Sequence, residues 1–140
     1  MKKIIFIALI CICFGLNIFA QTKVKVLKYE VPTFPAVAQA TMTSSEVVVT
    51  VKIDKEGNVI SSKSESGHPF FRKVSEETAT KWIFSKDDNL QEREITVTFA
   101  FVAKADNSSK NNYRQTKIKN RFKKPYRLEI LATIYPRIDI

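Results

Sequence analysis

The sequence predicts one small α+β domain, a split β-α-β unit in which two helices cover one face of a three-stranded antiparallel or mixed sheet. Three observations lead to this class. Residues Glu46–Ile53 alternate between apolar and mostly polar side chains. Asp54-Lys55-Glu56-Gly57 follows directly and has the composition of a hairpin turn. Further on, apolar or small side chains recur at helical spacing, at Phe71, Val74, Thr78 and Trp82.

The stretch Glu46–Ile53 predicts a half-buried strand, because every second residue belongs to one face. That face carries only β-branched apolar residues, namely Val47, Val49, Val51 and Ile53. Gly57 suits the left-handed position that closes a bulged hairpin. We therefore expect a second strand from Asn58 to about Glu65, folded back against the first.

Two helices are expected on either side of this hairpin. Pro35 suits a first helical turn, and the alanines after it predict a short helix that ends near Thr41. Ser66-Gly67-His68-Pro69 predicts a turn, followed by a helix from about Phe70 to Trp82. His68 is the only histidine of the chain and is interpreted as a turn residue, because no partner for a metal site or catalytic triad accompanies it.

A third strand is predicted over Glu94–Val102, where Ile95, Val97, Phe99 and Phe101 share one face. A helix that crosses the sheet brings this strand back beside the first one. The first strand is then central, and Asn58–Glu65 and Glu94–Val102 are the two edges. Because an uncovered edge exposes a row of backbone N–H and C=O groups, we expect Glu94–Val102 to pair with another chain.

The rest of the chain divides by composition. Residues 1–20 predict a signal peptide, with a retained membrane anchor as the alternative, because two lysines precede an apolar run. Residues 21–30 are a lead-in, and 31–103 form the domain. Residues 104–140 are interpreted as a basic, largely flexible tail that the domain does not need for folding. Within that tail only Pro125–Leu131 and Ile134-Tyr135 have strand character.

Positive charge is concentrated in this tail. Eleven Lys and Arg balance eleven Asp and Glu from Gln21 to Ala103, whereas ten oppose three from Lys104 to Ile140. Lys110–Arg127 is therefore a candidate for binding anionic surfaces. No nucleophile–base pair, metal-ligand spacing or glycine-rich phosphate loop is found, so we predict a binding protein without cofactor, specific nucleic acid or enzymatic activity.

Several of these motifs occur together in one known family. In order and spacing, six of these motifs resemble the C-terminal domain of TonB. They are the stretch 32–40, the valine strand, the Asp-x-x-Gly turn, Ser66-Gly67-His68-Pro69, Trp82-Ile83-Phe84 and Ile95–Phe101. The resemblance covers about Val31 to Ala103. It implies a periplasmic domain that engages outer-membrane receptors and pairs its last strand with an extended receptor peptide, the TonB box.

If that implication holds, the partner contacts the last strand and the proline-aromatic opening of the domain. The residues expected to contact it are Pro32, Phe34, Pro35, Ile95, Thr96, Val97, Thr98, Phe99 and Ala100. A second copy of the domain could pair with the same edge in place of a receptor. Two alternatives for the whole protein stay open: a short energy transducer anchored in the inner membrane, and a secreted binder of anionic surfaces.

Overall fold

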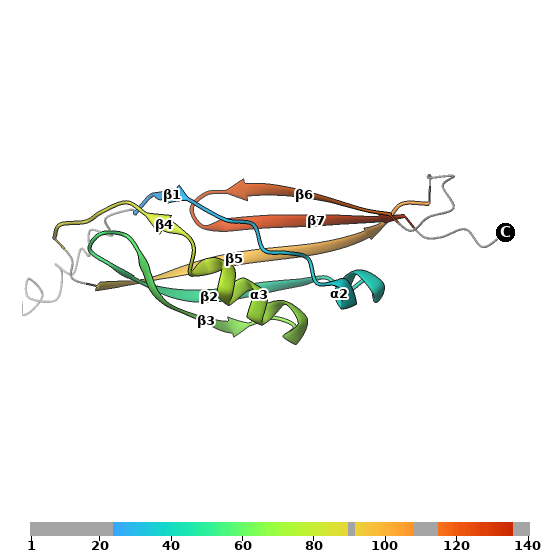
Figure 1. Cartoon of the computed structure of the whole chain (residues 1–140), viewed down its shortest axis with the longest axis horizontal. Helices are drawn as coiled ribbons and strands as arrows, with labels where there is room; N and C mark the ends of the chain where they lie inside the picture. Colours follow the sequence, from blue (N-terminus) through green and yellow to red (C-terminus); the bar gives the residue numbers. More distant parts are fainter. Residues whose placement is uncertain (1–23, 90–91, 108–114, 136–140) are drawn as a thin grey trace, which may run out of the picture.

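The computed structural model describes residues 24–89, 92–107 and 115–135 of the 140-residue chain (Figure 1). The predicted leader, residues 1–20, lies outside the described residues. Within those residues no helix has the length and apolar character needed to cross a membrane. The elements in chain order are β1 (Val26–Lys28), α2 (Ala36–Ala40), β2 (Ser45–Asp54), β3 (Val59–Ser66), α3 (Pro69–Ala79), β4 (Ile83–Phe84), β5 (Glu92–Ala105), β6 (Gln115–Lys123) and β7 (Arg127–Tyr135).

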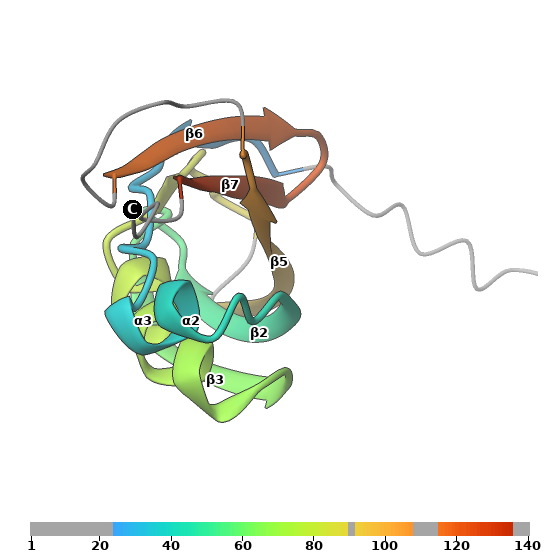
Figure 2. The same cartoon turned by 90° about the vertical axis from the view of Figure 1, so that its right-hand side faces the viewer.

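Five strands form one sheet in the order β3-β2-β5-β7-β6, while β1 pairs with β4 in a separate two-stranded sheet. β2 is antiparallel to β3 and β5, β7 is parallel to β5, and β6 is antiparallel to β7. Seen end-on, the sheet curves around the side on which α2 and α3 lie (Figure 2). The α+β class is confirmed, but the predicted three-stranded sheet is wrong, because the chain after Ala103 adds two strands.

The β2–β3 hairpin forms where the sequence predicts it. Val47, Val49 and Val51 are fully buried and alternate with half-exposed residues on the opposite face. In the turn, the Gly57 N–H donates to the Asp54 carbonyl oxygen at 3.1 Å. Gly57 has a φ of 90°, and a Cβ atom there would lie 2.1 Å from the Phe84 carbonyl oxygen, so only glycine fits.

Both predicted helices are present and slightly shorter than expected. The His68 side chain caps α3 by accepting a hydrogen bond from the Phe70 N–H at 3.3 Å. Trp82 lies after the helix, in the turn that leads to β4, and not within it. The residue is 1% exposed, and its ring meets the Phe99 ring edge-on with centroids 5.5 Å apart, as expected for a core residue.

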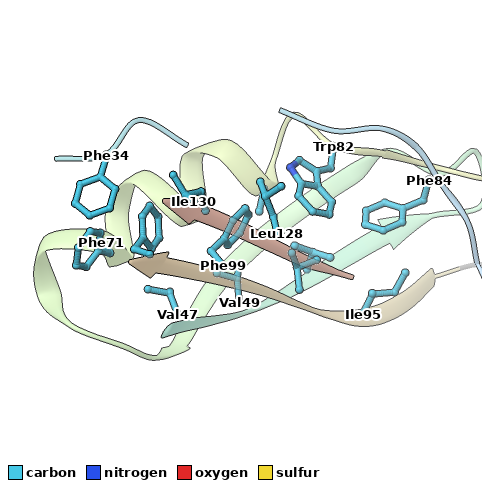
Figure 3. Packing of buried hydrophobic residues seen from close by; sticks show 14 of the residues in the cluster. Phe34, Val47, Val49, Phe71, Trp82, Phe84, Ile95, Phe99, Leu128 and Ile130 are labelled. Atoms are coloured by element: carbon cyan, nitrogen blue, oxygen red, sulfur yellow. The ribbon is translucent and has the colours of Figure 1, made fainter. Parts of the chain in front are cut away.

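One hydrophobic core fills the inner face of the sheet (Figure 3). β2 and β5 contribute their alternating apolar residues, and Phe34 and Phe71 pack against them from the segment before α2 and from α3. The core continues across β7, whose buried side chains are Leu128, Ile130, Ala132 and Ile134. β7 therefore completes the core of the domain.

The region predicted as a flexible tail is therefore largely folded in its described part. Within its described residues, 104–107 and 115–135, the chain ends β5 and forms the β6–β7 hairpin. Pro125–Leu131 and Ile134-Tyr135, which have strand character, lie in β7 or in the turn before it. The β5 edge, which we expected to be uncovered, has this hairpin beside it.

Candidate functional site

The outer edge of β5 was the predicted partner site, and the chain itself covers much of it. β7 pairs with β5 from Thr98 opposite Arg127 to Ala105 opposite Ile134. At the start of this ladder, the Thr98 N–H donates to the Tyr126 carbonyl oxygen at 2.9 Å, and past its end the Asp106 N–H donates to the Ile134 carbonyl oxygen at 2.9 Å. The N–H of Thr98 therefore points away from β2, as a peptide-binding edge requires, but it already has an acceptor.

The predicted contact residues of β5 divide between the core and this edge. Ile95, Val97 and Phe99 are buried side chains of the inner face. Ala100 is 6% exposed, on the outer face of the sheet. Thr98 is half-buried, and Thr96 is exposed. Glu92–Val97 lies before the start of β7, so within the described residues this short part of the β5 edge has no strand opposite it.

The proline-aromatic opening is also internal. Pro32 and Phe34 are buried, and Pro35 is half-buried at the start of α2. The Phe34 ring meets the rings of Phe71 and Phe101 edge-on at 5.4 and 5.7 Å. These residues fix the segment before α2 against the sheet, so direct contact with a partner would require that segment to move.

The hairpin that covers β5 is held on several sides. The Tyr126 hydroxyl donates to the Val24 carbonyl oxygen at 2.6 Å, and burial raises the pKa of this hydroxyl. Phe122 stacks on Tyr29 with ring centroids 4.8 Å apart, and also touches Trp82. Removing β7 would expose Leu128, Ile130 and Ile134, at a cost of roughly 1.5–3 kcal/mol for each. This cost is of the order of a domain's whole stability, so β7 is a permanent part of the sheet.

The opposite edge of the sheet, β3, is guarded by a side chain of α3. The Glu76 carboxylate accepts hydrogen bonds from the Ser64 N–H at 2.7 Å and from the Ser64 hydroxyl at 2.6 Å. The Ser62 hydroxyl donates to the Glu76 carbonyl oxygen at 2.8 Å. The hydrogen bonds from Ser64 lower the pKa of Glu76. An incoming strand would have to replace these contacts.

The edge of β6 has no such guard among the residues that the structure describes. β6 pairs with β7 over nine residues without a register shift, from Gln115 opposite Tyr135 to Lys123 opposite Arg127. No other described strand pairs with β6. Its cationic residues alternate and therefore share the outer face: Lys117, Lys119, Arg121 and Lys123.

The sequence itself carries a local signal for the strand β6. Residues 117–123 alternate between cationic and uncharged side chains, which is the period of a strand with one charged face. The prediction of a flexible tail rests on the polar, basic composition of residues 104–124 and on their lack of an apolar period. Leu128, Ile130, Ala132 and Ile134 continue the same period in β7 and would have shown which face is buried.

None of the described residues forms a cluster of three or more His, Cys, Asp or Glu side chains able to hold a metal ion. The described surface offers a partner strand edges and charged side chains. Of the three edges, β3 is guarded by Glu76, β5 is covered from Thr98 onward, and β6 is open along its described length.

The match to a family model concerns the part of the chain before the β6–β7 hairpin. Residues 30–103, more than half of the chain, match the family model described as the Gram-negative bacterial TonB protein C-terminal. A solution NMR structure of the Pseudomonas aeruginosa TonB C-terminal domain is similar at 24% sequence identity and a TM-score of 0.46, covering 59% of this chain and 88% of that one. No curated protein matches the chain. The chain therefore belongs to the TonB C-terminal family.

Proposed function

We propose that this chain is a non-catalytic periplasmic module that serves TonB-dependent transport by binding an extended peptide of an outer-membrane receptor. The observation that carries the proposal is the family match over residues 30–103, because this family interacts with outer-membrane receptors in general. The open strand edge gives such a peptide a way to bind. An extended chain that adds to a sheet gains backbone hydrogen bonds without a preformed pocket.

The mode of binding differs from the one that the sequence predicts. A receptor peptide that paired with β5 from Thr98 onward would have to displace β7 and expose its core side chains. The peptide therefore adds beside a strand whose outer side has no described strand, either β6 or the part of β5 before Thr98. Most of the predicted contact residues Ile95–Ala100 then support the sheet. Of these residues, only Thr96 and the backbone around it could contact a peptide that adds to β5.

The test is a titration of the isotopically labelled chain with synthetic peptides that span the periplasm-facing segments of outer-membrane receptors from the same cells. We expect at least one peptide to shift backbone amide resonances along an open edge. The same peptide with two prolines at alternate positions, which cannot add as a strand, is the control and should not bind. If none of the receptor peptides shifts any resonance at millimolar concentration, the proposed function is wrong.

The alternative of a short transducer anchored in the inner membrane is separated by a second measurement. Intact mass spectrometry of the protein from cells gives the first residue of the mature chain. A chain that begins at Gln21 supports a module released into the periplasm. A chain that retains residues 1–20 and fractionates with the inner membrane would establish the anchored form instead.

A further inference from the structure

We propose that the outer edge of β6 binds an acidic extended segment of a partner protein, which adds to the sheet as a sixth strand. The inference rests on the proposed function in that it gives the bound peptide its chemical class and its place. It begins from the shape of the edge. The nine paired residues of β6 contain no bulge, so the edge is regular over about 30 Å, at roughly 3.3 Å for each residue.

The charge on this edge is one-sided. Lys117, Lys119, Arg121 and Lys123 follow one another at every second position, so neighbouring cations are about 7 Å apart along the strand. All four residues are exposed. Within the described part of the chain, only Lys123 has an ion-pair partner, the Glu129 carboxylate at 2.8 Å.

Glu129 cannot balance the other cations, because it is shared. Its carboxylate also lies 3.7 Å from the Arg127 guanidinium, and its pKa is lowered chiefly by the hydrogen bond from Lys123. Arg127 in turn pairs with Glu46 at 2.8 Å. The β6–β7 hairpin from residue 115 to 135 carries six cationic side chains and one acidic one. A partner that brings carboxylates to β6 would therefore gain Coulomb attraction as well as backbone hydrogen bonds.

The inner face of β6 indicates which residues the ligand carries between its acidic ones. Ile118 is 45% exposed there, and Phe122 is half-buried under Tyr29. An added strand also alternates, so residues that face the cations are separated by residues that lie near Ile118 and Phe122. The expected ligand therefore has Asp or Glu at every second position and apolar or β-branched residues between them.

Charge argues against a second copy of this chain as the occupant. Pairing of β6 with its own copy would place Lys117–Lys123 opposite another row of cations, and like charges directly opposite one another destabilise a strand pair. An anionic membrane would attract the cations but leave the outward backbone N–H and C=O groups of β6 without a strand partner. The regular, open edge beside the cations is the feature that favours a peptide strand.

The experiment uses the purified chain in the form in which cells accumulate it, and a nine-residue peptide that alternates Glu with Val or Thr. We expect this peptide to shift the amide resonances of β6 and to slow hydrogen exchange of its outward N–H groups. The triple variant Lys117→Glu, Lys119→Glu, Arg121→Glu should bind it at least about tenfold more weakly, since three attractive pairs become repulsive. The same variant should gain affinity for a peptide with Lys in place of Glu, which also shows that it is folded.

Four results would overturn the inference. Equal binding of an acidic peptide interrupted by prolines, or of phosphatidylglycerol vesicles without any change in β6 hydrogen exchange, would mean that the surface recognises charge alone. Absence of binding by any acidic peptide would mean that the cations only protect the edge from other strands. Receptor peptides that bind at Glu92–Val97 or β3 and leave β6 unchanged would contradict this inference and keep the proposed function. Binding of the Glu peptide without binding of any receptor peptide would keep this inference and contradict the proposed function.

Discussion

β5 and β6 both direct a row of backbone N–H and C=O groups to one side, but what lies on that side differs. β5 from Thr98 onward is covered by a strand with buried apolar side chains, whereas β6 ends the sheet and presents a row of cations. The strand that lies beside each edge accounts for the difference. β7 can cover β5 because Leu128 and Ile130 extend the core, while an apolar neighbour for β6 would face Lys117–Lys123. Side-chain pattern, more than backbone exposure, thus decides which edge stays open.

Deleting the β6–β7 hairpin is the change expected to have the largest effect on this difference between the two edges. Deletion of residues 104–140 takes away three large buried side chains, worth together roughly 5–9 kcal/mol, and leaves their contacts on β5 exposed. We expect the shortened chain to lose its cooperative unfolding transition in urea. A truncated chain that melts like the full one would restore the view of residues 104–140 as a dispensable tail.

Single substitutions sharpen the contrast between the two strands of the hairpin. Leu128→Ala in β7 should lower the free energy of unfolding by about 2–5 kcal/mol, because the side chain is fully buried. Ile118→Ala in β6 removes a side chain that is 45% exposed and should cost no more than about 0.5 kcal/mol. Urea melts of both variants measure the difference, and similar losses for the two would contradict the assignment of β7 to the core.

Proline substitutions test the covered and uncovered parts of the β5 edge. Thr98→Pro removes the N–H that donates to Tyr126 and places a ring carbon against its acceptor, so we expect a loss of roughly 2–3 kcal/mol. Thr96 is two residues earlier, so its N–H points the same way, but β7 begins only opposite Thr98. Thr96→Pro should therefore cost clearly less in the same urea melts. Equal costs would mean that β7 does not protect this edge.

The smallest effect concerns the guarded edge of β3. The hydrogen bonds from Ser64 lower the pKa of Glu76, so its ionised form adds stability above the unfolded pKa, and this stability is lost as the pH falls through the folded pKa. Glu76→Gln should reduce the free energy of unfolding by roughly 1 kcal/mol at pH 7. The difference from the unmodified chain should vanish well below about pH 4. A difference that is the same at pH 7 and pH 3 would exclude the carboxylate as its cause.

Sequence reasoning located the elements of the matched region well, because their signals are local. The alternation of Val47–Ile53, the glycine of the turn and the proline that begins α3 each determine a conformation without reference to the rest of the chain. The same reasoning failed for β6, where Ile118 and Phe122 are too few to show which face is buried. It also could not place β7, because the partner of Leu128 and Ile130 is β5, some 30 residues earlier.

The predicted site shows the same division. Three strands alone predict an uncovered β5 edge, whereas β7 covers it from Thr98 onward; only the outward direction of the Thr98 N–H agrees with the expectation. What could not be predicted is that the acceptor, Tyr126, comes from the same chain. The resemblance predicts Pro32 and Phe34 as partner contacts, whereas both are buried, and the Phe34 ring packs against Phe71 and Phe101.

The central claim is that β7 closes the β5 edge while β6 remains open, and native-state hydrogen exchange followed by NMR tests it most directly. The amide protons of Thr98 and of every second residue up to Lys104 point toward β7 and should exchange only through global unfolding. The outward amide protons of β6 should exchange faster by orders of magnitude in the same sample. Exchange of Thr98 as fast as that of the outward β6 amides would contradict the account.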